Sequence, residues 1–129
     1  MKFAKEYLII IVILVIVFLT NYITSKNLGE AVKWMSDGIT SIENKISENK
    51  ESEAQQEFYE LEEKWKKEAE TLSLFVEHNE LEKVSTNIVI IESNFETDET
   101  DKVLENLAEV RFLLEHIEEK NQLKLKNIF

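Results

Sequence analysis

One uninterrupted apolar run near the N-terminus constrains this chain more than any other feature. Tyr7 to Leu19 reads YLIIIVILVIVFL, without a charge, a Gly or a Pro, and residues 20–23 extend it to 17 residues. A helix needs roughly 17 to 25 residues to cross the hydrocarbon core of a bilayer. The remaining residues are too few to bury such a helix in a soluble core. We therefore expect residues 7–23 to cross the membrane lipid bilayer.

A cleaved signal peptide is the alternative to a retained anchor. The basic start, with Lys2 and Lys5, fits both. The apolar stretch is longer than the usual signal-peptide core of about 7 to 15 residues, and residues 21–26 offer no A-x-A-like cleavage site. We expect an uncleaved signal-anchor, with Tyr7 and Tyr22 at the two membrane interfaces.

Charge predicts the orientation and the two parts of the chain. Positive residues mark the cytoplasmic side of a span. Lys2 and Lys5 are concentrated just before the apolar run, whereas Lys26 and Lys33 are spread over a longer stretch after it. We expect residues 1–25 to form a cytoplasmic tip and anchor in the cell membrane, and residues 26–129 an acidic extracytoplasmic domain. That domain has 13 Lys/Arg against 25 Asp/Glu, so it should repel nucleic acids and anionic lipid headgroups.

The soluble part has the composition and periodicity of helices. The chain has no Pro and two Gly, and it is rich in Glu, Lys, Leu and Ala. Residues 88–91, IVII, would suit a strand, but the surrounding apolar spacing is helical. Four apolar stripes follow: Leu28, Val32, Met35, Ile39, Ile42 and Ile46; Ala54, Phe58, Leu61, Trp65, Ala69, Leu72 and Val76; Leu81, Val84, Ile88, Ile91 and Phe95; and Val103, Leu107, Val110, Leu114 and Ile117, widened by Leu104, Ala108 and Leu113.

Polar clusters predict where these helices begin and end. Ser52–Gln55 has the S-x-x-Q form of a capping box, which predicts the start of the second helix. That helix is predicted to end near Glu77–His78, and Asn79–Glu82 to cap the third. Residues 97–101 predict a turn, and the tail over residues 121–129 is left open.

The second half of the soluble part repeats the first at an offset of 49 residues. Val32 corresponds to Leu81 and Trp65 to Leu114, with the turn between them in register. Gene duplication and the chance similarity of two hairpins both explain this pattern. In either case we expect an all-α fold in which two helical hairpins form a small antiparallel four-helix bundle after the transmembrane helix.

No catalytic or metal-binding signature is present. There is no Cys, phosphate-binding Gly loop, nucleophile elbow or zinc-protease motif. His78 and His116 do not complete the Glu-x-x-His of di-iron bundles, because Phe75 and Leu113 occupy the Glu positions. We expect both histidines near helix C-termini, where the dipole favours them. We predict no enzyme activity, no cofactor, no metal and no small-molecule substrate.

The two tryptophans are predicted to differ. Trp65 lies on a core stripe and should be packed. Trp34 lies beside the first stripe, so it either rests against the bundle or marks a contact surface for a partner.

Several segments resemble one known family. They are the Trp65 helix leading to residues 77–80, the pattern L-x-x-L-x-x-V-x-x-L-L-E-H-I over residues 104–117, and the ending Asn127–Phe129. Across nearly its whole length the chain resembles short membrane-anchored proteins of spore-forming Firmicutes, known as domain of unknown function 4363. The resemblance implies this architecture and no activity, and it hints at a membrane protein partner.

These observations favour a non-enzymatic accessory or scaffold protein that docks to a membrane protein partner. The alternative is an extracytoplasmic ligand-binding or sensory bundle, whose helices enclose a small molecule or ion.

Retention of the anchor is directly testable. The intact mass of the protein extracted from membranes should include residues 1–25, because the exit from the span lacks a cleavage site. A mature N-terminus near Lys26, measured by mass spectrometry, would contradict the signal-anchor.

Overall fold

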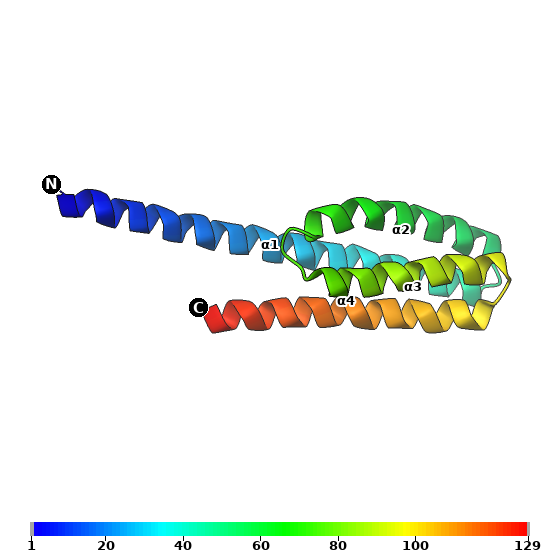
Figure 1. Cartoon of the computed structure of the whole chain (residues 1–129). Helices are drawn as coiled ribbons and strands as arrows, with labels where there is room; N and C mark the ends of the chain where they lie inside the picture. Colours follow the sequence, from blue (N-terminus) through cyan, green and yellow to red (C-terminus); the bar gives the residue numbers. More distant parts are fainter. Residues whose placement is uncertain (1, 129) are drawn as a thin grey trace.

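The described part of the chain is helical almost throughout. The computed structural model describes residues 2–128, in which four helices and no strand occur (Figure 1). Met1 and Phe129, the last residue of the family-like ending, lie outside the described residues. The predicted all-α class is confirmed. The helices are α1, Lys2–Ser47; α2, Glu51–Leu72; α3, His78–Glu96; and α4, Thr100–Ile128.

The four helices form an up-down-up-down bundle. Backbone contacts join α1 to α2, α2 to α3, α3 to α4 and α4 back to α1, whereas the backbones of the diagonal pairs stay apart in the described residues. Sequential neighbours therefore pack antiparallel, as in four-helix bundles with short loops. We call the end of the bundle with the α1–α2 and α3–α4 turns the distal end, and the end with the α2–α3 loop the proximal end (Figure 1).

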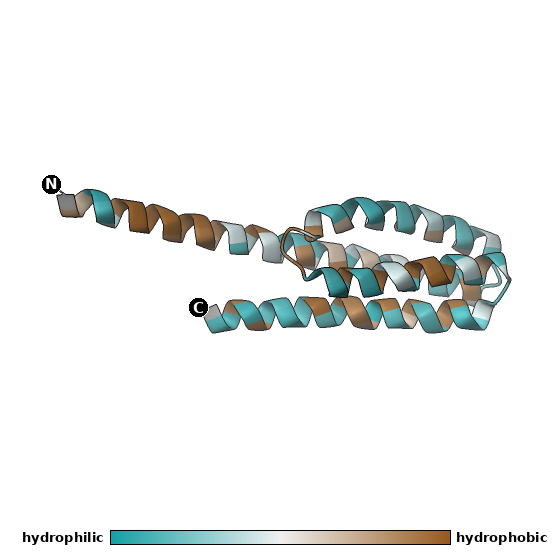
Figure 2. Ribbon diagram, in the orientation of Figure 1, coloured by the Kyte–Doolittle hydropathy of each residue, from teal (hydrophilic) through white to brown (hydrophobic). Residues whose placement is uncertain are grey.

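Helix α1 is 46 residues long, and only its second part belongs to the bundle. Nearly every side chain from Phe3 to Ile23 is exposed, and Thr24 is the first buried one. We call residues 7–23 of this protruding part the apolar arm; Figure 2 shows most of it as hydrophobic, with a paler, partly hydrophilic stretch just before the bundle. No Gly or Pro separates the arm from the bundle helix, so both share one helix axis.

The core contains the predicted stripes. All predicted positions of the first, third and fourth stripes are buried, whereas Leu61, Ala69 and Val76 of the second are half-buried. Trp65 and Leu114, the equivalent pair in the repeat, are both 1% exposed. The flanking positions differ: Leu104 and Leu113 pack against the core, but Ala108 is exposed, which contradicts the prediction.

The repeat extends to the backbone of the two distal turns. Asn49 and Asp98, 49 residues apart, both have left-handed φ angles, 61° and 56°. The next N–H in each turn, of Lys50 or Glu99, donates to the carbonyl five residues earlier, at 2.8 and 2.9 Å. These are Schellman motifs, and Asn and Asp tolerate their left-handed residue better than most side chains do. The two hairpins thus share turn geometry as well as sequence spacing.

The predicted caps of α2 and α3 are wrong. The Lys50 carbonyl accepts a hydrogen bond from Ala54 N–H at 3.0 Å, so α2 begins at Glu51 and Ser52 lies inside the helix. The Glu77 carbonyl similarly accepts from Leu81 N–H at 3.3 Å, so α3 begins one residue before Asn79. Neither cap residue makes a side-chain capping hydrogen bond.

Helix α2 also ends earlier than predicted, at Leu72 rather than near Glu77–His78. The N–H groups of Leu74 and Phe75 bond to carbonyls three residues back, at 3.2 and 3.0 Å, which tightens and closes the helix. Phe75 and Val76 then pack against the core from the loop. These two apolar residues continue the sequence pattern of α2 beyond the helix itself, which explains why its C-terminal end was predicted too late. The open tail proves helical to Ile128.

The core assignment predicts which tryptophan stabilises the bundle. Trp65→Ala should lower the free energy of unfolding by about 3–5 kcal/mol and Leu114→Ala by about 2–5 kcal/mol. In the full chain in mild detergent, the melting temperature measured by circular dichroism should therefore fall by more than about ten degrees. Trp34→Ala, at a half-buried position, is the control and should cost less; a larger loss there would contradict the assignment.

Candidate functional site

The apolar arm is the largest apolar surface of the molecule. At about 1.5 Å per residue, its 17 residues extend about 26 Å, close to the roughly 30 Å of a hydrocarbon core. It belongs to the one helix in the described residues that is long and apolar enough to cross a membrane. Tyr7 and Tyr22, at its two ends, are 65% and 67% exposed.

The polar side chains at the end of the arm are satisfied within the helix. Thr20 Oγ1 donates to the Ile16 carbonyl at 2.8 Å, and Thr24 Oγ1 donates to the Thr20 carbonyl at 2.7 Å. A hydroxyl that already has a partner costs less to remove from water. These threonines are therefore compatible with an apolar environment around the arm.

The outer face of α3 is a second exposed apolar surface. Val89 and Ile90 are 60% and 42% exposed, and no charged residue occurs between Lys83 and Glu92. We call Val89, Ile90 and their helical neighbours Thr86 and Ser93 the α3 face. The predicted stripe placed only Ile88 and Ile91 of the IVII run in the core, and both are buried, but the sequence analysis did not single out the exposed Val89 and Ile90 as a surface.

Trp34 is half-buried on α1 and contacts α2. The Lys64 Nζ lies 4.2 Å from the centroid of its indole ring, a cation–π geometry. The ring also packs against the core cluster. The structure thus places Trp34 against the bundle with part of its surface exposed, and its role as a partner contact stays a prediction.

A carboxyl group lies at the contact between α2 and α3. Glu62 is 6% exposed, and its Oε2 has no hydrogen-bond partner in the described structure. Burial, together with the neighbouring Glu92 carboxyl, raises the pKa of Glu62 to about 7. Lys66 Nζ, 3.9 Å from Glu62 Oε1, opposes the increase in pKa. The sequence analysis missed this residue, because Leu61 beside it fits the apolar stripe.

The distal end contains a polar cavity of about 130 Å³. Asn94, 7% exposed, is among its lining residues, and the Asn94 Nδ2 has no hydrogen-bond partner in the described structure. A water molecule takes up about 30 Å³ in the liquid, so the cavity has room for a few waters or a small polar solute. The lining residues are Ile46, Glu51, Ser52, Gln55, Asn94, Phe95, Asp98, Thr100 and Val103.

Neither histidine lies where the sequence analysis expected. His78 is the first residue of α3, and His116 lies within α4, so the helix C-terminal dipole stabilises neither. His78 Nε2 is 3.7 Å from a Glu82 carboxylate oxygen, and the His116 ring stacks on Phe112 with centroids 6.4 Å apart. Within residues 2–128, no group of three or more His, Cys, Asp or Glu side chains is placed to hold a metal ion.

One family matches most of this chain. The model of the family described as Domain of unknown function (DUF4363) matches residues 19–128, which include the end of the arm and the whole described bundle. No curated protein and no solved structure matches the chain. The family description gives no activity, so a functional proposal depends on the surfaces described above.

The buried carboxyl predicts a pH-dependent stability. Unfolded Glu62 ionises near its usual pKa of 4.5, whereas the folded carboxyl retains its proton up to about pH 7. Its contribution to stability is therefore fully present below about pH 4.5 and is lost as the pH rises to about 7. Glu62→Gln should melt at a higher temperature than the unchanged chain at pH 8, and the difference should shrink towards pH 5.

Glu63→Gln is the matched control, because Glu63 is the exposed neighbour on the same helix. It should show no such pH dependence. Equal differences in melting temperature between Glu62→Gln and the unchanged chain at pH 5 and pH 8 would contradict the raised pKa.

Proposed function

We propose that this chain, which belongs to the DUF4363 family, is a non-enzymatic, single-pass membrane protein whose small bundle docks to a membrane protein partner. In this proposal the apolar arm is the anchor. Its exposed side chains support this assignment, since a soluble protein rarely leaves a continuous apolar surface of this size in water. The cell membrane is the proposed location.

The observation that carries the proposal is the continuity of α1. Because the arm and the first bundle helix form one helix, a membrane-embedded arm would hold the bundle directly at the membrane surface. The first buried bundle residue, Thr24, follows the last arm residue directly. A bundle held this close to the bilayer lies beside the proteins that are in or at the membrane.

The proposed orientation has the N-terminus in the cytoplasm and the bundle outside. Lys2 and Lys5 support it, since both lie within five residues of the apolar arm. Lys26 and Lys33 are spread over a longer stretch on the other side.

The α3 face is the proposed docking surface. Val89 and Ile90 expose branched apolar side chains on a domain whose surface is otherwise dominated by carboxylates and lysines. Interface centres are depleted in charge and enriched in apolar contacts. Trp34, on α1, is a second candidate contact.

A ligand-binding or sensory bundle is the second candidate function. The distal cavity supports it, because Asn94 brings an unpaired amide group to a polar space. A small polar solute there would satisfy this donor.

The docking proposal predicts a partner that depends on the α3 face. The full chain, purified from its native membranes in mild detergent, should bring with it a stoichiometric integral membrane protein. The double variant V89E/I90E should lose it, because two carboxylates would have to be buried in the interface. Quantitative mass spectrometry of the purified samples measures the ratio.

The matched control is A108E/F112E, which adds the same charge to exposed positions of α4. It should keep the partner. Loss of the partner from this variant alone would move the docking surface to α4. A chain that purifies alone with a bound small molecule would favour the ligand-binding alternative.

A further inference from the structure

Three segments of the bundle lack carboxylates. Residues 20–29, 71–76 and 120–127 together contain four Lys and no Asp or Glu. The rest of the bundle, residues 30–70 and 77–119, has 9 Lys/Arg and 25 Asp/Glu. We call the first group the collar and the second the body. The collar therefore carries a net charge of +4 and the body −16.

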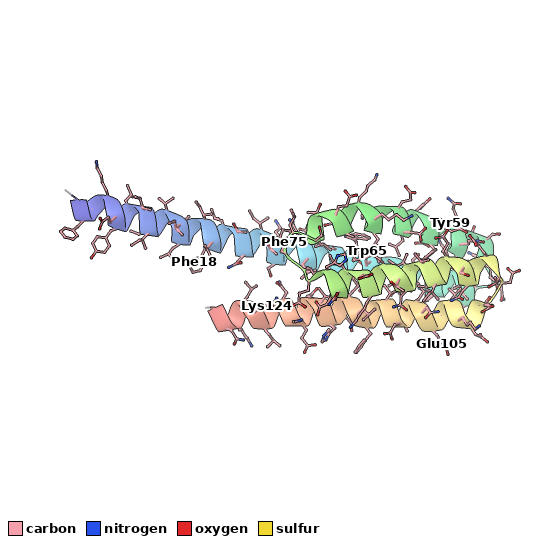
Figure 3. All side chains as sticks on the ribbon, in the orientation of Figure 1. Phe18, Tyr59, Trp65, Phe75, Glu105 and Lys124 are labelled. Atoms are coloured by element: carbon pink, nitrogen blue, oxygen red, sulfur yellow. The ribbon has the colours of Figure 1, made fainter. Side chains whose placement is uncertain are left out.

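The fold brings the three collar segments to the proximal end. Residues 20–29 are the part of α1 that joins the arm to the bundle, residues 71–76 are the end of α2 and most of the α2–α3 loop, and residues 120–127 are the last turns of α4 (Figure 1). The loop ends with Glu77, which belongs to the body and pairs with Lys120 and Lys124 of the collar. Figure 3 shows Phe75 of the loop and Lys124 of α4 at this end. The three segments are far apart in sequence, so the pattern exists only in the folded chain.

Ion pairs fix the last turns of α4 against the start of α3. Lys120 Nζ lies 3.0 Å from a Glu80 carboxylate oxygen and 3.3 Å from one of Glu77. Lys124 Nζ is 4.0 Å from Glu77 and stays 57% exposed. Beyond this clamp, α4 continues past the loop in the direction of the arm (Figure 1). Among the described residues, Lys26 and Lys126 have no carboxylate within ion-pair distance.

The collar also exposes large apolar side chains. Leu74, at the tip of the α2–α3 loop, is 79% exposed, and Leu123 on α4 is 55% exposed. Exposed Leu side chains beside Lys are typical of protein surfaces that lie in the interface of an anionic membrane. An apolar side chain there leaves water while the ammonium groups meet phosphates.

We propose that the collar binds the headgroups of anionic phospholipids in the leaflet from which the arm emerges. This inference depends on the proposed function, because it requires the arm to lie in a membrane. Lys26 follows the last arm residue, Ile23, by three residues, or about 4.5 Å of helix, which places Lys26 at headgroup level. The end of α4, with Lys124 and Lys126, extends beyond the loop alongside the arm and so reaches the same interface (Figure 1). The acidic body is repelled by the same surface, and the bundle therefore stands on its proximal end.

The test uses the full chain reconstituted in two kinds of vesicle, one of phosphatidylcholine alone and one with about a third phosphatidylglycerol. Amide hydrogen exchange over residues 120–127 should be at least about tenfold slower in the anionic vesicles, and 0.5 M NaCl should remove most of the difference. Residues 55–65 of the body should exchange equally in both. Equal exchange of residues 120–127 in the two vesicles would overturn the proposal.

The variant K26Q/K124Q/K126Q should lose the dependence on lipid charge. It leaves Lys120 in place, so the clamp to α3 is retained. K50Q/K67Q/K83Q removes the same charge from the body and should keep the dependence. If both variants lost it equally, net charge rather than the collar would control the contact, and the proposal would fail.

Two further outcomes are separable. If the chain does not float with either vesicle after an alkaline wash, the arm is not an anchor and the proposed function fails first. If the chain floats, and residues 120–127 are protected equally in both vesicles in proportion to protein density, the collar binds the acidic body of a second copy instead. That result would overturn the lipid assignment and leave the anchor intact.

Discussion

The rest of the structure depends on the continuity of α1, because one helix supplies both the apolar arm and a quarter of the bundle. Its two parts place their apolar residues differently: the arm exposes them on all sides, whereas the bundle part buries them along one stripe. Helices α2 and α4 are both bound to α1 by ion pairs. Lys45 Nζ lies 2.6 Å from a Glu57 carboxylate oxygen on α2, and Arg111 donates to Glu43 on α1 from α4 at 2.6 Å. The helix that contains the arm is therefore bound to both α2 and α4.

The contact between α2 and α3 has a different character. It contains no ion pair among the described residues, and its polar contact is the 3.1 Å hydrogen bond from Trp65 Nε1 to Ser85 Oγ. Glu62 and Glu92 bring two carboxyl groups together there, which favours the protonated form of Glu62. Since removal of a buried carboxylate from water is costly, this contact weakens as the pH rises. Two contacts join the hairpins α1–α2 and α3–α4, and the one between α2 and α3 is thus the one that responds to pH.

Much of the fold could be predicted from apolar spacing, because helical stripes depend only on local sequence. The stripes from Leu28 to Ile46 and from Leu81 to Phe95 were predicted residue by residue. Helix ends were predicted poorly. The end of α2 was placed too late, because Phe75 and Val76 continue the apolar pattern from the loop. Its start was placed too late as well, because the Lys50 carbonyl already accepts the first hydrogen bond of the helix before Ser52. The surfaces were harder still. The predicted stripe left Val89 and Ile90 of the IVII run outside the core, but apolar spacing alone does not show whether a neighbouring helix covers them.

The collar could not be predicted from the sequence, because the net charge of a domain does not show where its charges lie in the fold. The net charge of −12 for residues 26–129 combines the acidic body with the basic collar, which lies next to the arm. A net charge of this sign predicts repulsion from anionic surfaces. However, the two ends of a bundle more than about 30 Å long are several Debye lengths apart at physiological salt. The charges at each end therefore interact with their surroundings almost independently. Lys26, Lys124 and Lys126 act on what is adjacent to the arm, whereas the carboxylates act on what approaches the body from the side. The uncharged α3 face belongs to that acidic body, so a partner that docks there gains from apolar contact and must itself avoid a large excess of negative charge.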